Sequence, residues 1–198
     1  MPFIACLHRC ISYVLLCCQV NCRLVIAGNH DAACRDLGAE RVRDILSNAT
    51  YLQDEPCSLE CGLFVYASPR SVRESARSTN TAFQPPLRTD IPAAAAEQIP
   101  DGIDLLVTHG PPAGVMDGGF GSETVMARVG VVCPTAHVFG HVHSQFGIQT
   151  KGPTTFANCA SVDSLYAVTH PVVVLDIPAK RLKRGEVRRR PVHSNRSF

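Results

Sequence analysis

Three polar residues follow an apolar run near the start of the chain, and their types could support chemistry. The run Arg23–Ala27 reads RLVIA and is followed by Gly28, Asn29, His30 and Asp31. An amide, an imidazole and a carboxylate at the end of a strand could address a metal ion or a phosphate group. The alternative is a turn that closes a strand, and the tetrapeptide alone does not decide between the two.

Two further apolar runs end in histidine, again beside glycine. His109 follows DLLVT, whereas His141 and His143 follow AHVFG. A single histidine at a strand end is more often an ordinary polar residue than a ligand. In an extended chain His141 and His143 would project to the same side. Together with Asn29, these three histidines occupy equivalent positions, which predicts a metal site suited to Mn, Fe or Zn rather than Ca.

Apolar runs and their spacing indicate the strands and helices that would position these residues. Five segments are expected to form buried strands: Leu24–Ala27, Leu63–Ala67, Ile103–Thr108, Ala136–Phe139 and Val172–Ile177. Helices are expected over Ala39–Ser47 and Ser122–Val129, with loop over most of Ser68–Pro100 except a helical piece near Ala93–Gln98. Strands interleaved with helices imply an α/β domain, in which the carboxyl ends of the strands gather the site residues.

The charge is distributed unevenly along the 198 residues, whose length fits one domain. From Lys180 onward there are eight Lys or Arg and one acidic residue, whereas the rest of the chain has eleven basic and sixteen acidic residues. We interpret residues 179–198 as a basic, disordered tail. No aromatic stacking platform accompanies its arginines, so no specific nucleic-acid partner is expected.

Ten cysteines do not form a recognisable framework. Five lie within the first 22 residues, and the C-x3-C spacings are not the C-x2-C spacing of a structural zinc site. The chain is also long enough to form a core without disulfides, so reduced thiols in a cytoplasmic protein are expected. The apolar run over residues 11–20 is shorter than the roughly 20 residues that span a bilayer, and no membrane partner is expected.

Three motifs occur in the order GNHD, THGPP and GHVH, at Gly28–Asp31, Thr108–Pro112 and Gly140–His143. In this order and at about these separations they resemble the calcineurin-like metallophosphoesterase superfamily. The sequence between Arg23 and Ile177 is similar to those of the small metallophosphoesterase-domain proteins related to the class III phosphodiesterases. The resemblance implies a sandwich of two mixed β-sheets flanked by helices.

The resemblance also implies a role for each site residue. Asn29, His109 and His141 would hold the second metal ion, and His143 would bind the first. His30 would be the catalytic histidine that protonates the leaving oxygen, with Asp31 orienting it. In the complete family site two ions about 3.5–4 Å apart clamp the phosphate.

The family's D-x-H and G-D motifs do not precede Asn29 in this sequence. We therefore interpret residues 1–22 as a non-homologous N-terminal segment and residues 23–178 as an N-terminally incomplete metallophosphoesterase domain. The first metal would keep only His143, so at most one ion is expected. The sheet is also expected to lack one or two inner strands, which would leave an open apolar edge, unless residues 1–22 cover part of it.

Two functions remain open from the sequence. The first is a metal-dependent phosphoesterase acting on a small phosphodiester or phosphomonoester, with a cyclic-nucleotide-like substrate possible under the resemblance. In the family, the Asp of the G-D motif would bridge both metal ions, and without this carboxylate the activity of this chain stays open. A misplaced gene start would explain the missing motifs. The alternative is a catalytically inactive relative that binds a nucleotide or a single metal. Protein partners are unknown.

Overall fold

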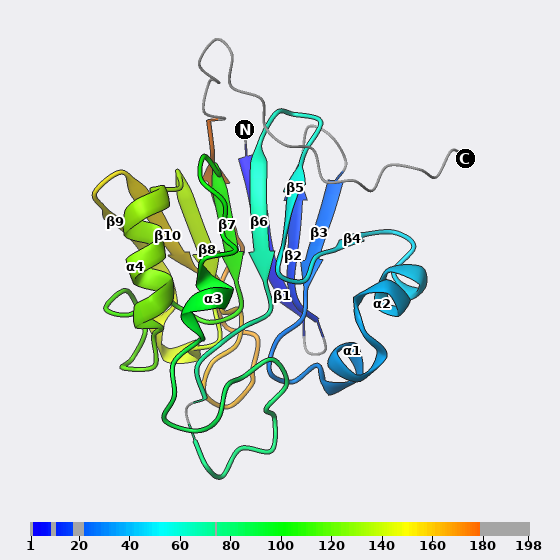
Figure 1. Cartoon of the computed structure of the whole chain (residues 1–198), viewed down its shortest axis with the longest axis vertical. Coiled ribbons are helices and arrows are strands. Elements are labelled where there is room, and N and C mark those ends of the chain that lie inside the picture. The colour runs from blue at the N-terminus through cyan, green and yellow to red at the C-terminus, as the bar shows by residue number, and fades with distance from the viewer. Residues whose placement is uncertain (1, 9–10, 18–21, 74, 179–198) are drawn as a thin grey trace.

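Two β-sheets pack face to face, with helices on both outer sides (Figure 1). The structure is a computed structural model, and it describes residues 2–8, 11–17, 22–73 and 75–178. The cluster between the sheets joins Leu24 and Ile26 of β3 (Cys22–Ile26) to Val65 of β6 (Phe64–Ser68). The alternate residues of the same strands face outward, toward the helices. The expected sandwich of two mixed sheets flanked by helices is confirmed.

The larger sheet supplies two of the strand ends that carry site residues. Its order is β5-β6-β7-β8-β10-β9, with β5 Glu55–Ser58, β7 Leu105–Thr108, β8 Ala136–Phe139, β9 Gly147–Lys151 and β10 Thr154–Asn158. The four inner strands β6, β7, β8 and β10 run parallel, and the outer strands β5 and β9 pair antiparallel. Parallel neighbours place the carboxyl ends of β7 and β8 at the same edge.

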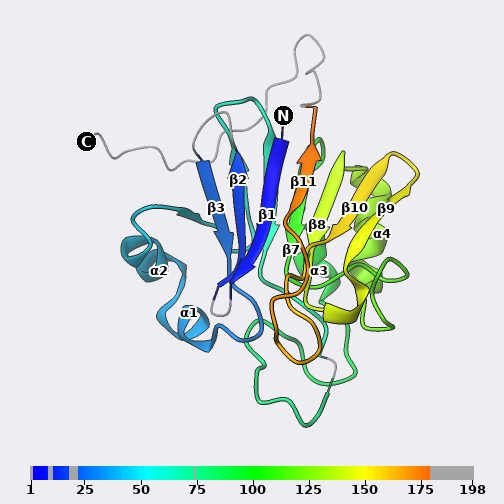
Figure 2. The ribbon, with the colours of Figure 1, turned by 180° about the vertical axis from the view of Figure 1, so that it is seen from behind.

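The smaller sheet has the order β11-β1-β2-β3-β4, with β1 Pro2–His8, β2 Ile11–Cys17, β4 Thr50–Tyr51 and β11 Val173–Asp176. Figure 2 shows β1 and β2 lying between β11 and β3. Both neighbours pair antiparallel with this hairpin, from Ala5↔Val173 on one side to Val14↔Val25 on the other. The prediction of an open edge is therefore wrong, because β1 and β2 lie between β3 and β11 in this sheet.

Helices cover the outer face of each sheet. α1 (Ala32–Leu37) and α2 (Ala39–Ile45) lie beside the smaller sheet, and α3 (Ala93–Ala96) and α4 (Glu123–Val132) beside the larger one (Figure 1). Ser122 is the N-cap of α4, since its Oγ accepts a hydrogen bond from the Val125 N–H at 3.2 Å. A short 3-10 helix, η1, spans His143–Gln145.

Most expected elements are present with boundaries shifted by one or two residues. All five predicted strands occur, as do the helices predicted near Ala39, Ala93 and Ser122. The elements that the sequence reasoning did not identify are β1, β2, α1, β4, β5, η1, β9 and β10. Within the described part of the chain, no helix is long and apolar enough to cross a membrane. The predicted basic tail lies outside the described residues.

Candidate functional site

The predicted site residues lie at the carboxyl ends of strands from both sheets. Asn29 follows β3, His109 follows β7 and His141 follows β8. Backbone hydrogen bonds fix His109 between its neighbours: its N–H donates to Ser68 O at 3.1 Å, and its carbonyl accepts from Gly140 N at 3.1 Å. The loops after β6, β7 and β8 are thus joined at this residue.

Asn29 and His109 are in direct contact although 80 residues separate them. The His109 Nε2–H donates to Asn29 Oδ1 at 2.8 Å, and the Asn29 amide donates to Asn80 O at 3.2 Å. Both side chains are buried. The contact brings an amide oxygen and an imidazole from different sheets to one point.

His141 lies against His109, with ring centroids 4.7 Å apart and planes inclined by 59°. Its φ of +67° is in the left-handed region, where a residue with a side chain is uncommon. Burial lowers the pKa of His109 well below its ordinary value, and His141, His30 and His143 lower it further. His109 is therefore neutral, which is the form that can bind a metal.

His143 reaches the same group by a different backbone path from the one expected. The chain is not extended here, because His141 has positive φ and His143 begins the 3-10 helix η1. The argument that strand alternation places both imidazoles on one side was therefore wrong. His143 is nevertheless close enough to His109 to lower its pKa. Its Nδ1–H donates to the carbonyl of Asp163 at 3.0 Å, which orients the ring.

His30 is exposed, whereas the neighbouring Asp31 is buried. The Asp31 Oδ2 accepts a hydrogen bond from Gly28 N at 2.7 Å, and the Asp31 N–H donates to Gly28 O at 3.0 Å. The carboxylate thus closes the turn that presents His30 to solvent. Its orienting effect on His30 stays a prediction.

The donor set suits one metal ion better than two. Among the described residues, no three His, Cys, Asp or Glu side chains form a group that could hold a metal. Asn29, His109 and His141 offer an amide oxygen and two imidazoles, a set compatible with a borderline ion. An ion on Asn29 Oδ1 and His109 Nε2 would replace the hydrogen bond between them, and the His109 proton would then sit on Nδ1.

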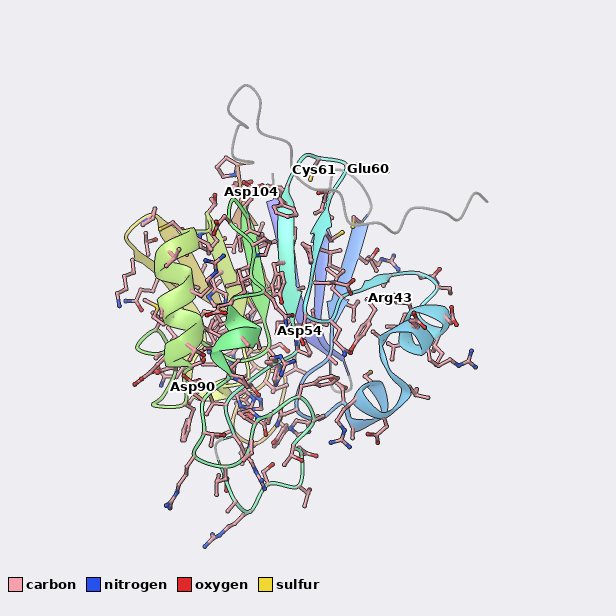
Figure 3. The ribbon with its side chains drawn as sticks, in the orientation of Figure 1. Arg43, Asp54, Glu60, Cys61, Asp90 and Asp104 are labelled. Atoms are coloured by element: carbon pink, nitrogen blue, oxygen red, sulfur yellow. The ribbon has the colours of Figure 1, made fainter. Side chains whose placement is uncertain are left out.

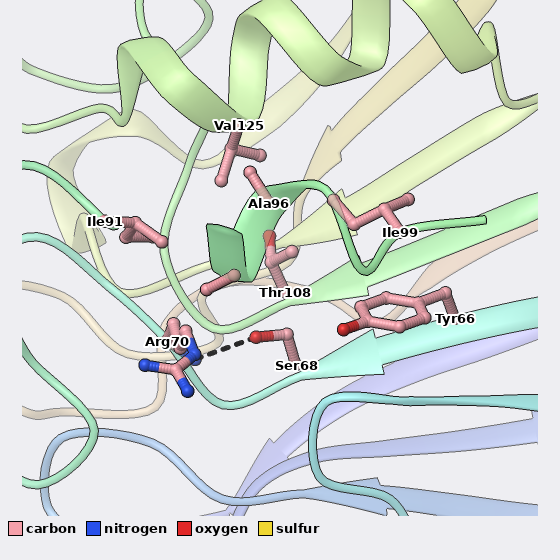
Figure 4. Close-up of a pocket in the computed structure, with 9 residues that line it drawn as sticks. Tyr66, Ser68, Arg70, Ile91, Ala96, Ile99, Thr108 and Val125 are labelled. Atoms are coloured by element: carbon pink, nitrogen blue, oxygen red, sulfur yellow. Dashed lines mark hydrogen bonds between the residues drawn. The ribbon is translucent and has the colours of Figure 1, made fainter. Parts of the chain in front are cut away.

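A small, partly open hollow with a cavity volume of about 10 Å³ lies beside Thr108, between the larger sheet and helices α3 and α4 (Figure 4). Its polar side carries Tyr66, Ser68, Arg70 and Thr108, and its apolar side includes Ile91, Ile99 and Val125. The Tyr66 hydroxyl is buried with no hydrogen-bond partner among the described residues. The sequence reasoning did not identify this hollow.

Asp54 connects Ser68 and Arg70, two residues of the polar side of that hollow. It lies in the middle of the molecule in Figure 3, at the end of the strands, where it accepts from Ser68 Oγ at 2.6 Å and from Arg70 Nε at 3.1 Å. An Arg70 Nη2 to Asp54 Oδ2 distance of 2.9 Å completes the ion pair. Two charges are neutralised beside the loop that carries His109.

Sequence reasoning also missed Tyr166 and Asp163. The Tyr166 ring lies edge-on to His143 at a centroid distance of 5.2 Å and to His30 at 5.9 Å. Asp163 holds His143 through its carbonyl. Both come from the long β10–β11 connection, and the sequence DSLYAVTH carries no pattern that would have placed them at the site.

Known proteins provide an independent comparison for this geometry. The UPF0046 protein K07C11.7 of Caenorhabditis elegans is 32% identical over 178 residues, covering 81% of this chain and 59% of the relative. The human metallophosphoesterase domain-containing protein 1 is also 32% identical, covering 72% of this chain and 44% of that protein. The chain belongs to the metallophosphoesterase-domain family. No protein-family model matches it.

This metallophosphoesterase-domain chain spans about half the length of the curated relatives that it matches, 59% and 44% of the two above. One solved crystal structure matches with a TM-score of 0.54 at 16% identity, covering 78% of this chain and 65% of the other. At that identity the match concerns the fold alone. It agrees with the two-sheet sandwich described above.

Proposed function

We propose that this chain is a metal-dependent phosphoesterase that hydrolyses a small phosphodiester or phosphomonoester, including cyclic-nucleotide-like esters. The observation that carries the proposal is the convergence of Asn29, His109 and His141 at one edge of the sandwich. The exposed imidazole of His30 adds a proton donor that substrate can reach. The family relationship supports a hydrolase but leaves the substrate open.

Asn29, His109 and His141 would hold a single Mn, Fe or Zn ion in this proposal. When bound, such an ion polarises a phosphoryl oxygen and lowers the pKa of a coordinated water. The Asn29 amide carries no charge, and burial keeps His109 neutral. A phosphate anion would therefore meet a net positive centre with no protein carboxylate among those donors to repel it.

His30, Asp31 and His143 would act around that centre. Exposed His30 would donate a proton to the leaving oxygen, and Asp31 would fix the turn on which it stands. His143, oriented by the Asp163 carbonyl, would bind the phosphoryl group or a weakly held second ion. The expected partner is a small phosphate ester, with neither a specific nucleic acid nor a membrane.

A second function is favoured by the missing carboxylate. No metal-holding group of three His, Cys, Asp or Glu side chains is present in the described part of the chain. A site built on imidazoles and one amide could bind a nucleotide or one ion without turning over. This inactive relative is the alternative that the first experiment must exclude.

The cysteines support a reducing compartment such as the cytoplasm. Among the described residues, Cys34, Cys57 and Cys159 are thiols outside any disulfide. Burial raises the pKa of Cys57 to about 11 and of Cys159 to about 12, which keeps both as unreactive thiols. We infer that neither Cys57 nor Cys159 serves catalysis.

The test combines metal binding with turnover. The full chain, freed of metal by chelation, is titrated with Mn²⁺ and Zn²⁺ by calorimetry and then assayed on bis(p-nitrophenyl) phosphate. We expect about one tightly held ion per chain and metal-dependent hydrolysis. His141→Ala should lower metal affinity at least tenfold and abolish turnover. Arg41→Ala, an exposed substitution on α2, is the matched control and should change neither quantity.

Each result separates the two functions. One bound ion without hydrolysis, with either Mn²⁺ or Zn²⁺, would favour the non-catalytic binding protein. Two tightly held ions would contradict the single-ion site. Neither binding nor hydrolysis in the wild-type chain would overturn both proposals.

A further inference from the structure

The connection between β10 and β11 holds one aromatic residue in an unusual backbone conformation. Tyr166 has a φ of +61°, in the left-handed region that bulky residues rarely adopt. Such a conformation costs free energy and persists only where surrounding contacts impose it. The contacts that impose it can be identified.

Asp163 fixes the turn that carries Tyr166. Its Oδ1 accepts hydrogen bonds from the N–H groups of Leu165 at 2.8 Å and Ala167 at 3.0 Å. Its carbonyl accepts from Tyr166 N at 3.0 Å, and its own N–H donates to Ala167 O at 2.9 Å. The same carbonyl accepts the His143 Nδ1–H at 3.0 Å. The turn that strains Tyr166 is thus attached directly to a site histidine.

The ring of Tyr166 touches histidines from two different strand ends. Its centroid lies 5.2 Å from that of His143, with the planes at 88°, and 5.9 Å from that of His30, with the planes at 67°. Both are edge-to-face contacts. The tyrosine therefore spans the side of the site where the proposed proton donor stands.

Much of this ring remains available to a ligand. Tyr166 is 49% exposed, and the neighbouring apolar side chains Leu165 and Val168 are 85% and 75% exposed. The contacts with His30 and His143 leave part of the ring free, beside further apolar surface. A group attached to a phosphate bound among the histidines could lie against this surface.

We propose that Tyr166 is a specificity-determining residue that favours phosphate esters with a planar aromatic group over aliphatic ones. The inference rests on the proposed phosphoesterase function and concerns the organic part of the substrate. A tyrosine is rigid, so it offers an aromatic face with little loss of side-chain entropy. Any planar aromatic ring can stack on such a face, and the stacking strengthens binding roughly tenfold per ring.

Phosphonates, which are not hydrolysed, test the preference for an aromatic group by binding alone. The full chain in Mn²⁺ is titrated with phenylphosphonate and methylphosphonate, which share the phosphoryl group and differ in the ring. We expect wild type to bind phenylphosphonate about tenfold more tightly. Tyr166→Asn should abolish this preference while leaving methylphosphonate affinity unchanged. Asparagine tolerates positive φ, so this variant should keep the loop.

Two matched variants distinguish the contribution of the Tyr166 ring from those of its hydroxyl and of the neighbouring apolar surface. Tyr166→Phe retains the face and should retain the preference. Leu165→Ala removes adjacent apolar surface without touching the ring, and should also retain most of it.

Three outcomes would overturn the inference alone: equal affinity of wild type for both phosphonates, a preference that survives Tyr166→Asn, or a preference lost equally in Leu165→Ala. Wild type that binds neither phosphonate and hydrolyses no ester would instead overturn the proposed function, and this inference with it.

Discussion

Two buried tyrosines show how a single hydroxyl can matter at the residue scale. Tyr51 and Tyr66 are each 1% exposed, and burial raises the pKa of both phenols. The Tyr51 hydroxyl donates to Gln53 Oε1 at 3.0 Å, whereas that of Tyr66 has no partner among the described residues and points toward the hollow in Figure 4. Removing a bonded hydroxyl and an unbonded one should therefore have different effects.

We expect Tyr51→Phe to lower the free energy of unfolding by about 1 kcal/mol. Tyr66→Phe should leave it unchanged or raise it slightly, because no hydrogen bond is lost and a buried polar group is removed. Urea denaturation of the two variants beside wild type measures both. An equal loss in Tyr66→Phe would show that a water molecule or ligand in the hollow binds this hydroxyl.

At the scale of elements, the loop after β7 depends on close contact with the loop after β6. A Cβ on Gly110 would lie 2.6 Å from Ser71 Cβ and 2.8 Å from Ser71 Cα. Thr108 strengthens the same turn by donating its hydroxyl to Gly110 O at 2.7 Å. Gly130, within α4, has no atom within 4 Å of the corresponding position. The same substitution should therefore act oppositely at the two glycines.

Gly110→Ala should cost about 1–3 kcal/mol of stability, because the β7 loop must move away from Ser71. Since His109 moves with that loop, metal affinity should fall as well. Gly130→Ala should stabilise by roughly 0.5–1 kcal/mol, as alanine is the better helix former. Thermal unfolding and the Mn²⁺ titration together test the pair. Gly110→Ala with wild-type stability and metal binding would contradict the tight loop packing.

At the scale of the whole molecule, a buried histidine couples global stability to pH. His137 in β8 is fully buried between Phe139 and Phe156, and its Nε2–H donates to Thr108 Oγ1 at 2.7 Å. Burial lowers its pKa to about 3. In the unfolded chain the imidazole would titrate near its usual value of about 6.5.

Because the folded pKa is the lower one, the unfolded chain binds the proton more readily between about pH 6.5 and pH 3. Stability linked to His137 is therefore complete above about pH 6.5. It declines by up to about 1.4 kcal/mol per unit as the pH falls through this window. Chemical denaturation at pH 7.5, 6 and 5 should show a shallower decline for His137→Gln than for wild type. Parallel curves would contradict a neutral buried imidazole.

The predictable part of the fold was the part fixed by local sequence. Short apolar runs marked all five expected strands, and Ser122 marked the start of α4 through its capping hydroxyl. Several elements were not predicted because they lack a local signal, among them β9, β1 and β2. β9 is mostly exposed and polar at Gln149 and Thr150, and β1 and β2 lie in the segment that was interpreted as non-homologous.

The sequence by itself determined which residue types stand at the strand ends: Asn29, His109, His141 and His143, each beside or near a glycine. These positions follow from short-range patterns of apolar and polar residues, which depend only on neighbours in the chain. The chemistry open to the site, a borderline metal ion and a phosphate ester, follows from the same residue types.

Tertiary structure alone decided which of these groups meet, and what surrounds them. The Asn29 to His109 hydrogen bond joins residues 80 apart, and the contact of Tyr166 with His30 spans most of the sandwich sequence. The hairpin β1–β2 gains its place only by pairing with β3 and β11, which lie on either side of it. Such contacts depend on the packing of the two sheets as a unit, because no local pattern in the chain encodes the distance between segments so far apart.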